Sequence, residues 1–250
     1  MEGFLRKLGI VTINVLFWGY FLLSSAVMFV GAVLIRIVTA PFDPNQRFLH
    51  RYSCFWASLY LWCNPFWRLK KKGLKNADPK KAYVIVSNHQ SWADIILLFN
   101  SFLPFKWVSK KQMFNAPFLG WNMRLNGYIP IERGNEESGR KCLQMSRDWL
   151  AKGASVLYFP EGTRSRDGKL LPFKMGAFKL AIESGHDILP VVIRGSLNAI
   201  PKDSALIRLK SPMTLEVLPP ISVHSFQGNE SGAESLMNHV RTIFKTKMGQ

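Results

Sequence analysis

The chain has 250 residues, of which 48% are hydrophobic and 20% are charged, and its formal net charge is +17. This composition excludes a disordered chain, and the length leaves no room for two full domains with a linker between them. The excess of positive charge predicts an anionic partner, which is a nucleic acid, a membrane surface or a phosphate-bearing substrate.

The N-terminal segment at residues 8–35 contains no charged residue. As an α-helix it would be about 42 Å long, which exceeds the thickness of a hydrocarbon core. A cleaved signal peptide has a shorter apolar core and a small-residue cleavage site. We therefore expect a retained membrane helix.

A second apolar segment, residues 48–67, follows a strong chain break at residues 41–44, PFDP. Its many aromatic residues are typical of the headgroup zone, so we expect an N-terminal two-helix membrane-embedded hairpin. A single full span is the alternative. Arg6, Lys7 and the basic run that follows residue 67 favour the hairpin, because the positive-inside rule then keeps both ends in the cytoplasm.

The basic run at residues 67–81, WRLKKKGLKNADPKK, contains a single acidic residue, Asp78. Beside a membrane segment, such a run is typical of contact with an anionic membrane surface, at about 1 kcal/mol per basic residue. A solvated linker is the alternative. Nucleic acid is not an expected partner, because the charge adjoins a membrane segment and no nucleic-acid-binding motif is present.

From about residue 82 onward, short apolar runs alternate with helical stretches. This alternation predicts an α/β fold built on a mixed, mostly parallel sheet flanked by helices. We expect a membrane-anchoring region at residues 1–66 and a main domain at residues 67–250. The predicted strands are residues 82–87, 105–109, 128–131, 154–159, 188–193 and 213–218, and the predicted helices are residues 92–100, 136–152, 174–184 and 231–247.

The stretch SNHQSWAD follows the first of these strands. In α/β folds, chemistry collects where strands end and helices begin. Positions i and i+5 of a helix diverge by about 140°, so His89 must precede the helix for its ring to meet Asp94. Asp94 would then fix the tautomer of the ring and leave its other nitrogen free to take a proton. The alternative is structural: Ser91 and Asp94 fit a capping box, and His89 would be a residue without a chemical role.

Two further strand ends carry polar groups. The loop at residues 158–178, YFPEGTRSRDGKLLPFKMGAF, brings together Glu161, Arg164, Arg166 and Lys174, with a turn at Gly162 and Thr163. GYIPIER ends on Arg133. A glycine turn with backbone amides, a hydroxyl and guanidinium groups can bind a phosphate. Any one of these residues could be an ordinary surface group, but three such strand ends together indicate a site.

NHQSWAD resembles the NHx4D motif of the glycerolipid acyltransferases, and FPEGTRS resembles their second hallmark block. GYIPIER and ILPVVI resemble two further blocks, in the family's order, between about Tyr83 and Pro220. KKQMFNAPFLGW and LPFKMGAF resemble the bacterial 1-acyl-sn-glycerol-3-phosphate (lysophosphatidic acid) acyltransferase branch. The resemblance implies a glycerol-3-phosphate acyltransferase-like fold.

The resemblance also implies transfer of a fatty acyl group from acyl-CoA or acyl-carrier protein to the sn-2 hydroxyl of lysophosphatidic acid, giving phosphatidic acid for phospholipid biosynthesis. His89 would be the general base, oriented by Asp94. It implies no metal and no cofactor beyond the thioester co-substrate. We expect the active site to face the cytoplasm at the inner (cytoplasmic) membrane, with a membrane lipid as substrate. The residues implied to hold the glycerol phosphate are Arg133, Glu161, Gly162, Thr163 and Arg164, with Lys110 as a further positive contact.

Three alternatives stay open at this point. An acyltransferase of the same family could act on another lysophospholipid, such as a lysocardiolipin or a lyso-ornithine lipid. A catalytically silent protein could bind anionic lipid through its basic run. A lipid esterase would need a nucleophilic Ser or Cys, and the chain has no GxSxG motif. An acyl chain also requires an apolar tunnel, and residues 99–107 are either one wall of it or ordinary core.

Overall fold

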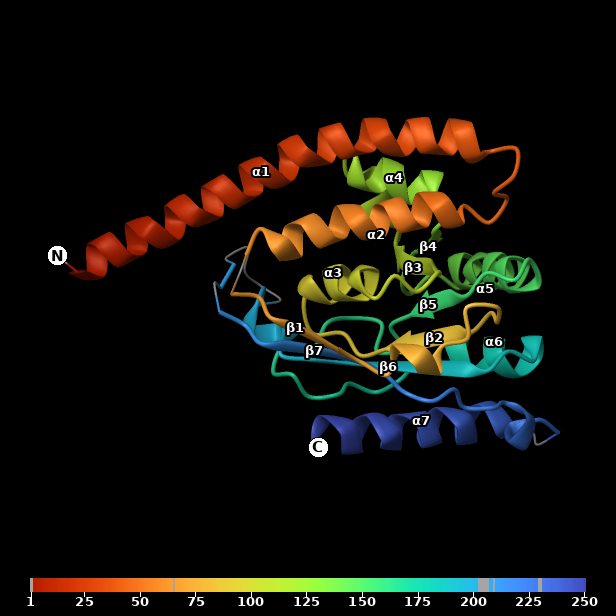
Figure 1. Cartoon of the computed structure of the whole chain (residues 1–250). Helices are drawn as coiled ribbons and strands as arrows, with labels where there is room; N and C mark the ends of the chain where they lie inside the picture. The colour runs from red at the N-terminus through yellow and green to blue at the C-terminus, as the bar shows by residue number, and fades with distance from the viewer. Residues whose placement is uncertain (1, 65, 202–206, 209, 229–230) are drawn as a thin grey trace.

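The computed structural model describes residues 2–64, 66–201, 207–208, 210–228 and 231–250 (Figure 1). Within these residues, strands form one seven-stranded sheet in the order β1-β7-β6-β2-β5-β3-β4, in which β6 and β7 are the antiparallel neighbours. The predicted α/β fold with a mixed, mostly parallel sheet is therefore confirmed. The strands are β1 (Leu69–Lys72), β2 (Val84–Ser87), β3 (Lys106–Lys110), β4 (Ile129–Ile131), β5 (Val156–Tyr158), β6 (Ile188–Arg194) and β7 (Met213–Val217).

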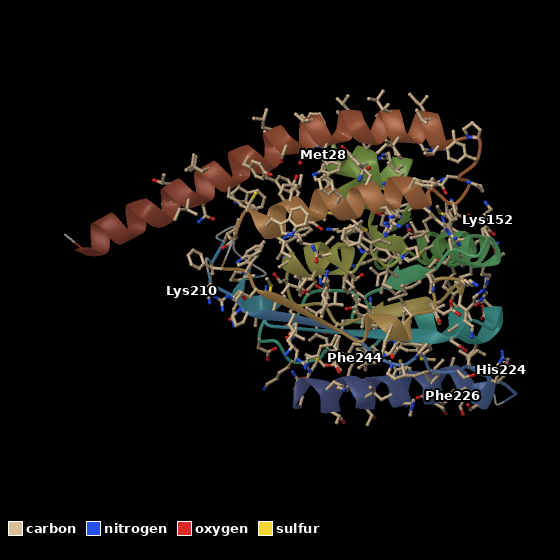
Figure 2. All side chains as sticks on the ribbon, viewed as in Figure 1. Met28, Lys152, Lys210, His224, Phe226 and Phe244 are labelled. Carbon is tan, nitrogen blue, oxygen red and sulfur yellow. The ribbon has the colours of Figure 1, made fainter. Side chains whose placement is uncertain are left out.

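Helices cover both faces of this sheet. The helix α3 lies on one face, with α2 and then α1 stacked above it, and α7 lies under the other face (Figure 1). Side chains alternate along β2, so Ile85 enters the core beneath α3 while Val84 and Val86 enter the core formed with α5, α6 and α7. Figure 2 shows Phe244 of α7, which is fully buried, in this second core. The helices are α1 (Glu2–Thr39), α2 (Arg47–Trp62), α3 (Ala93–Asn100), α4 (Leu119–Leu125), α5 (Glu136–Ala151), α6 (Gly176–Ser184) and α7 (Gly232–Met248).

Each predicted strand and helix of the main domain is present, within a few residues of its expected bounds. The sequence does not predict β1, because LKKK has no apolar residue at alternate positions. This strand is at the edge of the sheet, where exposed lysines oppose pairing with another chain. Nor does it predict α4, which is shorter than two helical turns.

The N-terminal region differs from the predicted two-helix membrane-embedded hairpin. Among the described residues, one helix is long and apolar enough to cross a membrane: α1, over Val11–Thr39, with 11% of its apolar window buried. This helix indicates membrane association. The second helix, α2, is part of the protein interior instead, because its Trp56 and Tyr60 are 3% and 4% exposed and hydrogen-bond to each other. The expectation of a second membrane-embedded helix is therefore wrong, since aromatic residues are as typical of a core as of a headgroup zone.

Specific contacts join α1 to the rest of the chain. A Cβ on Gly31 would lie 2.2 Å from the hydroxyl oxygen of Tyr52, so only glycine permits this approach of α1 to α2. The Tyr52 hydroxyl donates to the carbonyl of Met28, at 3.0 Å (Met28 is labelled in Figure 2). Nearer the N-terminus, the side-chain oxygen of Asn14 accepts from the amide of Ile207, at 2.8 Å. The helix is thus held against the domain at several levels.

Candidate active site

The chain leaves β2 at a fixed point, which determines where His89 lies. The amide side chain of Asn88 is fully buried and pairs with the main chain of Ile193 at the end of β6. It donates to the carbonyl and accepts from the N–H of Ile193, both at 2.8 Å. These two hydrogen bonds resemble those between neighbouring strands of a sheet. They place His89 in the loop before α3, as the sequence predicts.

His89 and Asp94 form a hydrogen-bonded pair. Nδ1 of His89 lies 2.8 Å from Oδ2 of Asp94, and this oxygen also accepts from the amides of Gln90 and Ser91 at 2.6 and 2.8 Å. Because an ionised carboxylate only accepts, Nδ1 carries the proton and Nε2 carries a free lone pair. The fully buried Asp94 also caps the start of α3 through the two amides. The two interpretations of SNHQSWAD, a His–Asp pair and a helix cap, are therefore both present.

The loop that follows β5 lies directly against His89. The ring of Phe159 stacks on the imidazole with centroids 4.0 Å apart and planes at 17°. The amide of Ser165 donates to the carbonyl of His89 at 2.8 Å. Glu161 accepts from the amide of His89 with one oxygen and from the amide of Leu171 with the other, both at 2.8 Å. The two hallmark segments of the sequence thus form one structural unit.

Glu161 is a buried carboxylate in this unit, with 5% of its surface exposed. Burial raises the pKa of Glu161 to about 7, the hydrogen bonds from Leu171 and His89 oppose that rise, and the nearby charge of Asp94 adds to it. Both oxygens of the side chain have partners inside the protein. The predicted contact of this residue with the glycerol phosphate stays a prediction.

A tight turn follows Glu161 and carries positive groups close to Gly162 and Trp92. Gly162 has a φ of 69°, in the left-handed region that favours glycine, and a Cβ there would lie 2.9 Å from Cε of Lys174. The stem of Lys174 therefore crosses the turn. After Thr163, the guanidinium carbon of Arg164 lies 4.7 Å from the centre of the Trp92 ring. The turn places two cationic side chains and a hydroxyl in a single loop, an arrangement suited to a phosphate.

Arg133 and Lys110 also lie at the carboxyl ends of strands, but further across the sheet from His89. Lys110 is the last residue of β3, Arg133 follows β4, and both are exposed. In the sheet, β4 is three positions from β2, which is about 14 Å at the usual strand spacing. Their predicted contact with the glycerol phosphate stays a prediction, at longer reach than that of the turn at Gly162.

An apolar cavity of about 350 Å³ lies between α1, α2, α3 and α4. This volume falls in the range of small-molecule sites. Phe99 and Trp107 line the cavity and also belong to the core, and the predicted contact of residues 99–107 with an acyl chain stays a prediction. Trp92 is part of the same lining, three residues after His89. Other lining residues include Phe17 and Phe21 of α1, Ala57 and Tyr60 of α2, and Met113 and Met123.

The sequence does not identify Trp92 and Phe159 as parts of the site, whereas Lys174 belongs to the loop that the sequence predicts to bind a phosphate. Trp92 and Phe159 are aromatic residues beside apolar runs, which is where core residues are found. The sequence signal that could have identified them is their position beside the ends of two strands, because the ends of β2 and β5 are adjacent in the sheet.

Within the described part of the chain, no group of three His, Cys, Asp or Glu side chains that could hold a metal ion is found.

Comparisons with known proteins identify the family. A family model described as "Acyltransferase" matches residues 68–194. A 1-acyl-sn-glycerol-3-phosphate acyltransferase of Pseudomonas aeruginosa is 35% identical over 69% of this chain and 68% of its own length. The chain belongs to the 1-acyl-sn-glycerol-3-phosphate acyltransferase family. The resemblance seen in NHQSWAD and FPEGTRS is thereby confirmed.

Other members of this family show the same relationship. A protein of that name from Chlamydomonas reinhardtii is 39% identical over 77% of this chain. The matched parts cover 58%, 64% and 55% of the algal and two plant relatives, so this chain spans less than two thirds of their lengths. The crystal structure of the 1-acyl-sn-glycerophosphate (LPA) acyltransferase PlsC from Thermotoga maritima has a TM-score of 0.78, with 22% identity, and covers 98% of this chain and 96% of its own. The fold is therefore shared with that enzyme.

Proposed function

We propose that this protein is a membrane-bound 1-acylglycerol-3-phosphate O-acyltransferase. It moves a fatty acyl group from acyl-CoA or acyl-carrier protein to the sn-2 hydroxyl of lysophosphatidic acid, giving phosphatidic acid. The position of Trp92 carries the proposal, because its ring contacts Arg164 and also lines the apolar cavity, three residues from His89. A phosphate-binding group, a base and a cavity for an acyl chain thus meet around one residue. The names of the relatives support the same reaction.

In this reaction, Nε2 of His89 accepts the proton of the sn-2 hydroxyl while the hydroxyl oxygen attacks the thioester carbonyl carbon. The carbon–sulfur bond then breaks, the thiolate takes the proton from the imidazolium, and His89 returns to its neutral form. Asp94 stabilises the intermediate imidazolium through Nδ1. No covalent acyl-enzyme is required, because the thioester is already an activated acyl donor.

The phosphate of the acceptor binds at the turn after Glu161. Arg164 offers a bidentate fork, and the stem of Lys174 crosses Gly162 and carries its ammonium group to the same turn. Arg133 and Lys110 add positive charge along the sheet edge. The fatty acyl chain occupies the apolar cavity, where its burial supplies binding free energy of about 0.8 kcal/mol per methylene.

The membrane helix brings the acceptor to this site. One side of α1 exposes Leu16, Leu23 and Val27, while Phe17 and Phe21 line the cavity. An amphiphilic acceptor can therefore reach the cavity along α1 without leaving the bilayer. The exposed lysines of β1 add contact with an anionic membrane surface. The basic run at residues 67–81 carries more positive charge than Arg6 and Lys7, so the positive-inside rule favours the cytoplasmic side for the main domain. We therefore assign the protein to the inner (cytoplasmic) membrane with its active site facing the cytoplasm, where acyl-carrier protein would meet it as donor and partner.

The first test is an assay of the purified chain in detergent with oleoyl-CoA and lysophosphatidic acid, in which phosphatidic acid is quantified by mass spectrometry. His89→Ala should reduce turnover by about 10²- to 10⁴-fold. The matched control is His224→Ala, which removes an exposed histidine of the short 3₁₀ helix His224–Phe226 (Figure 2) and should leave turnover unchanged. Equal activity of His89→Ala and wild type would exclude His89 as the base. Acylation of another lysophospholipid in place of lysophosphatidic acid would exclude the proposed acceptor.

A further inference from the structure

Glu161 lies in the hallmark block that the proposed function assigns to phosphate binding, yet its contacts are with the protein. Its two oxygens accept from the amides of His89 and Leu171, both at 2.8 Å, and the residue is 5% exposed. A carboxylate cannot donate to a phosphate, and its negative charge repels one. Glu161 therefore has neither the chemistry nor the open face of a phosphate ligand.

The main chain of His89 is held from both sides by the loop after β5. Glu161 accepts from its N–H, and the amide of Ser165 donates to its carbonyl at 2.8 Å. Asp94 then fixes the ring at Nδ1, and Phe159 stacks on its face. These contacts fix the orientation of the ring relative to its own main chain. The position of Nε2 therefore depends on where Glu161 holds the main chain of His89. A displacement of about 1 Å at a reacting atom costs roughly 100-fold in rate.

The second oxygen of Glu161 connects the same carboxylate to the far side of the substrate loop. Leu171 lies beyond Arg164 and Gly168 in the chain, so the bridge from His89 to Leu171 closes the loop that carries Arg164. Burial beside the Asp94 carboxylate disfavours the charge of Glu161 and raises its pKa to about 7, so this bridge is maintained against an electrostatic cost. Such a cost is typical of a functional group rather than of a residue that serves stability.

We propose that Glu161 is a positioning residue, which fixes the main chain of the base His89 and couples it to the loop that holds Arg164, and that it does not bind the substrate phosphate. This inference rests on the proposed function for its kinetic consequences. The residues of FPEGTRS then have two different roles. Phe159, Glu161 and Ser165 position the base, whereas Gly162, Thr163 and Arg164 face the phosphate.

The test uses the full chain in detergent at pH 8, where the carboxyl is ionised. Glu161→Gln keeps the size of the side chain but replaces one acceptor oxygen by an NH₂ group, so it loses the hydrogen bond to one of the two amides. We expect kcat to fall by about 10- to 100-fold while KM for lysophosphatidic acid changes less than about twofold. Glu161→Asp keeps the charge but shortens the reach, and should give an intermediate kcat with the same KM. The matched control is Glu137→Gln, the same chemical change at an exposed carboxylate of α5, which should match the wild type.

Amide hydrogen exchange of the peptide that contains His89, followed by mass spectrometry, provides a readout that does not need activity. Faster exchange of the His89 amide in Glu161→Gln, and unchanged exchange in Glu137→Gln, would support the inference even if lysophosphatidic acid proved to be the wrong acceptor. A raised KM with kcat retained would overturn it in favour of phosphate binding. An unchanged kcat, or unchanged exchange at His89, would overturn it as well.

Discussion

The guanidinium carbon of Arg164 lies 4.7 Å from the centre of the Trp92 indole ring. Arg164 comes from the loop after β5, and Trp92 immediately precedes α3. A planar guanidinium over an aromatic face gains cation–π and stacking energy, and its orientation is restricted by that contact. Since the same indole lines the apolar cavity, the contact fixes the guanidinium group of Arg164 relative to that cavity.

Arg164→Lys should therefore weaken acceptor binding although the charge is kept. Lysine lacks the planar fork and does not stack on Trp92 in the same way. We expect KM for lysophosphatidic acid to rise by about tenfold, with a smaller change in kcat, in steady-state kinetics at fixed oleoyl-CoA. Arg140→Lys, at an exposed position of α5, is the control. A KM equal to that of the wild type would show that Arg164 does not bind the acceptor.

The sequence is sufficient to predict the His–Asp pair because the motif is local. His89 and Asp94 flank a single junction between a strand and a helix, and periodicity alone shows that the histidine must precede the helix. The contacts of Trp92 with Arg164, and of Glu161 with the amide of His89, depend on β2 and β5 being neighbours in the sheet. No pattern along the chain contains that adjacency, so these contacts appear only in the folded structure.

The N-terminal region shows a different limit of sequence reasoning. Hydropathy is sufficient to predict that α1 is a membrane helix, because its apolar stretch is long and without charge. The same criterion gives the wrong environment for α2, because Trp56 and Tyr60 are buried by protein and not by lipid. Hydrophobic composition indicates that these residues are buried, but it does not indicate whether protein or lipid buries them. Similarly, the lysine-rich sequence of β1 is not typical of a strand, and the strand forms because it pairs with β7.

Gly162→Ala should destabilise the turn that we propose to bind the phosphate. A Cβ there forces a left-handed conformation on an alanine and meets Cε of Lys174 at 2.9 Å. We expect a loss of about 1–2 kcal/mol in the free energy of unfolding, together with a raised KM for lysophosphatidic acid. The control is Gly139→Ala in α5, where nothing lies within 4 Å of the new Cβ and alanine favours the helix. Equal unfolding midpoints for Gly162→Ala and wild type would contradict this account of the turn.

Glu161 should also make the stability of the protein depend on pH. Burial raises its pKa from 4.5 to about 7. An acid whose pKa is higher in the folded state stabilises that state while it is protonated, so its contribution is complete below pH 4.5 and is lost as the pH rises through 7. At one pKa unit per 1.36 kcal/mol, the change is about 3 kcal/mol.

Glutamine at this position does not ionise, so the comparison isolates this contribution. Between pH 5 and pH 8, we expect the free energy of unfolding of the wild type to fall by up to about 3 kcal/mol relative to Glu161→Gln. Chemical denaturation in detergent at several pH values measures this difference. A difference that is independent of pH would mean that the carboxyl keeps an ordinary pKa in the folded protein.

Ala57→Phe should change the preference of the protein for acyl chain length. Ala57 lies on α2 and lines the apolar cavity, so a phenyl ring there fills space that a long chain would occupy. Each methylene group that is excluded from the cavity lowers the binding free energy of the chain by about 0.8 kcal/mol. Exclusion of two or more methylene groups therefore shifts the ratio of rates for octanoyl and oleoyl substrates by about tenfold or more. Competition assays with acyl-CoA mixtures and with lysophosphatidic acids of different chain lengths reveal which of the two substrates places its chain in the cavity. Ala151→Phe, at an exposed position at the end of α5, controls for the added bulk. If neither ratio differed from that of the wild type, the cavity would not be the acyl site.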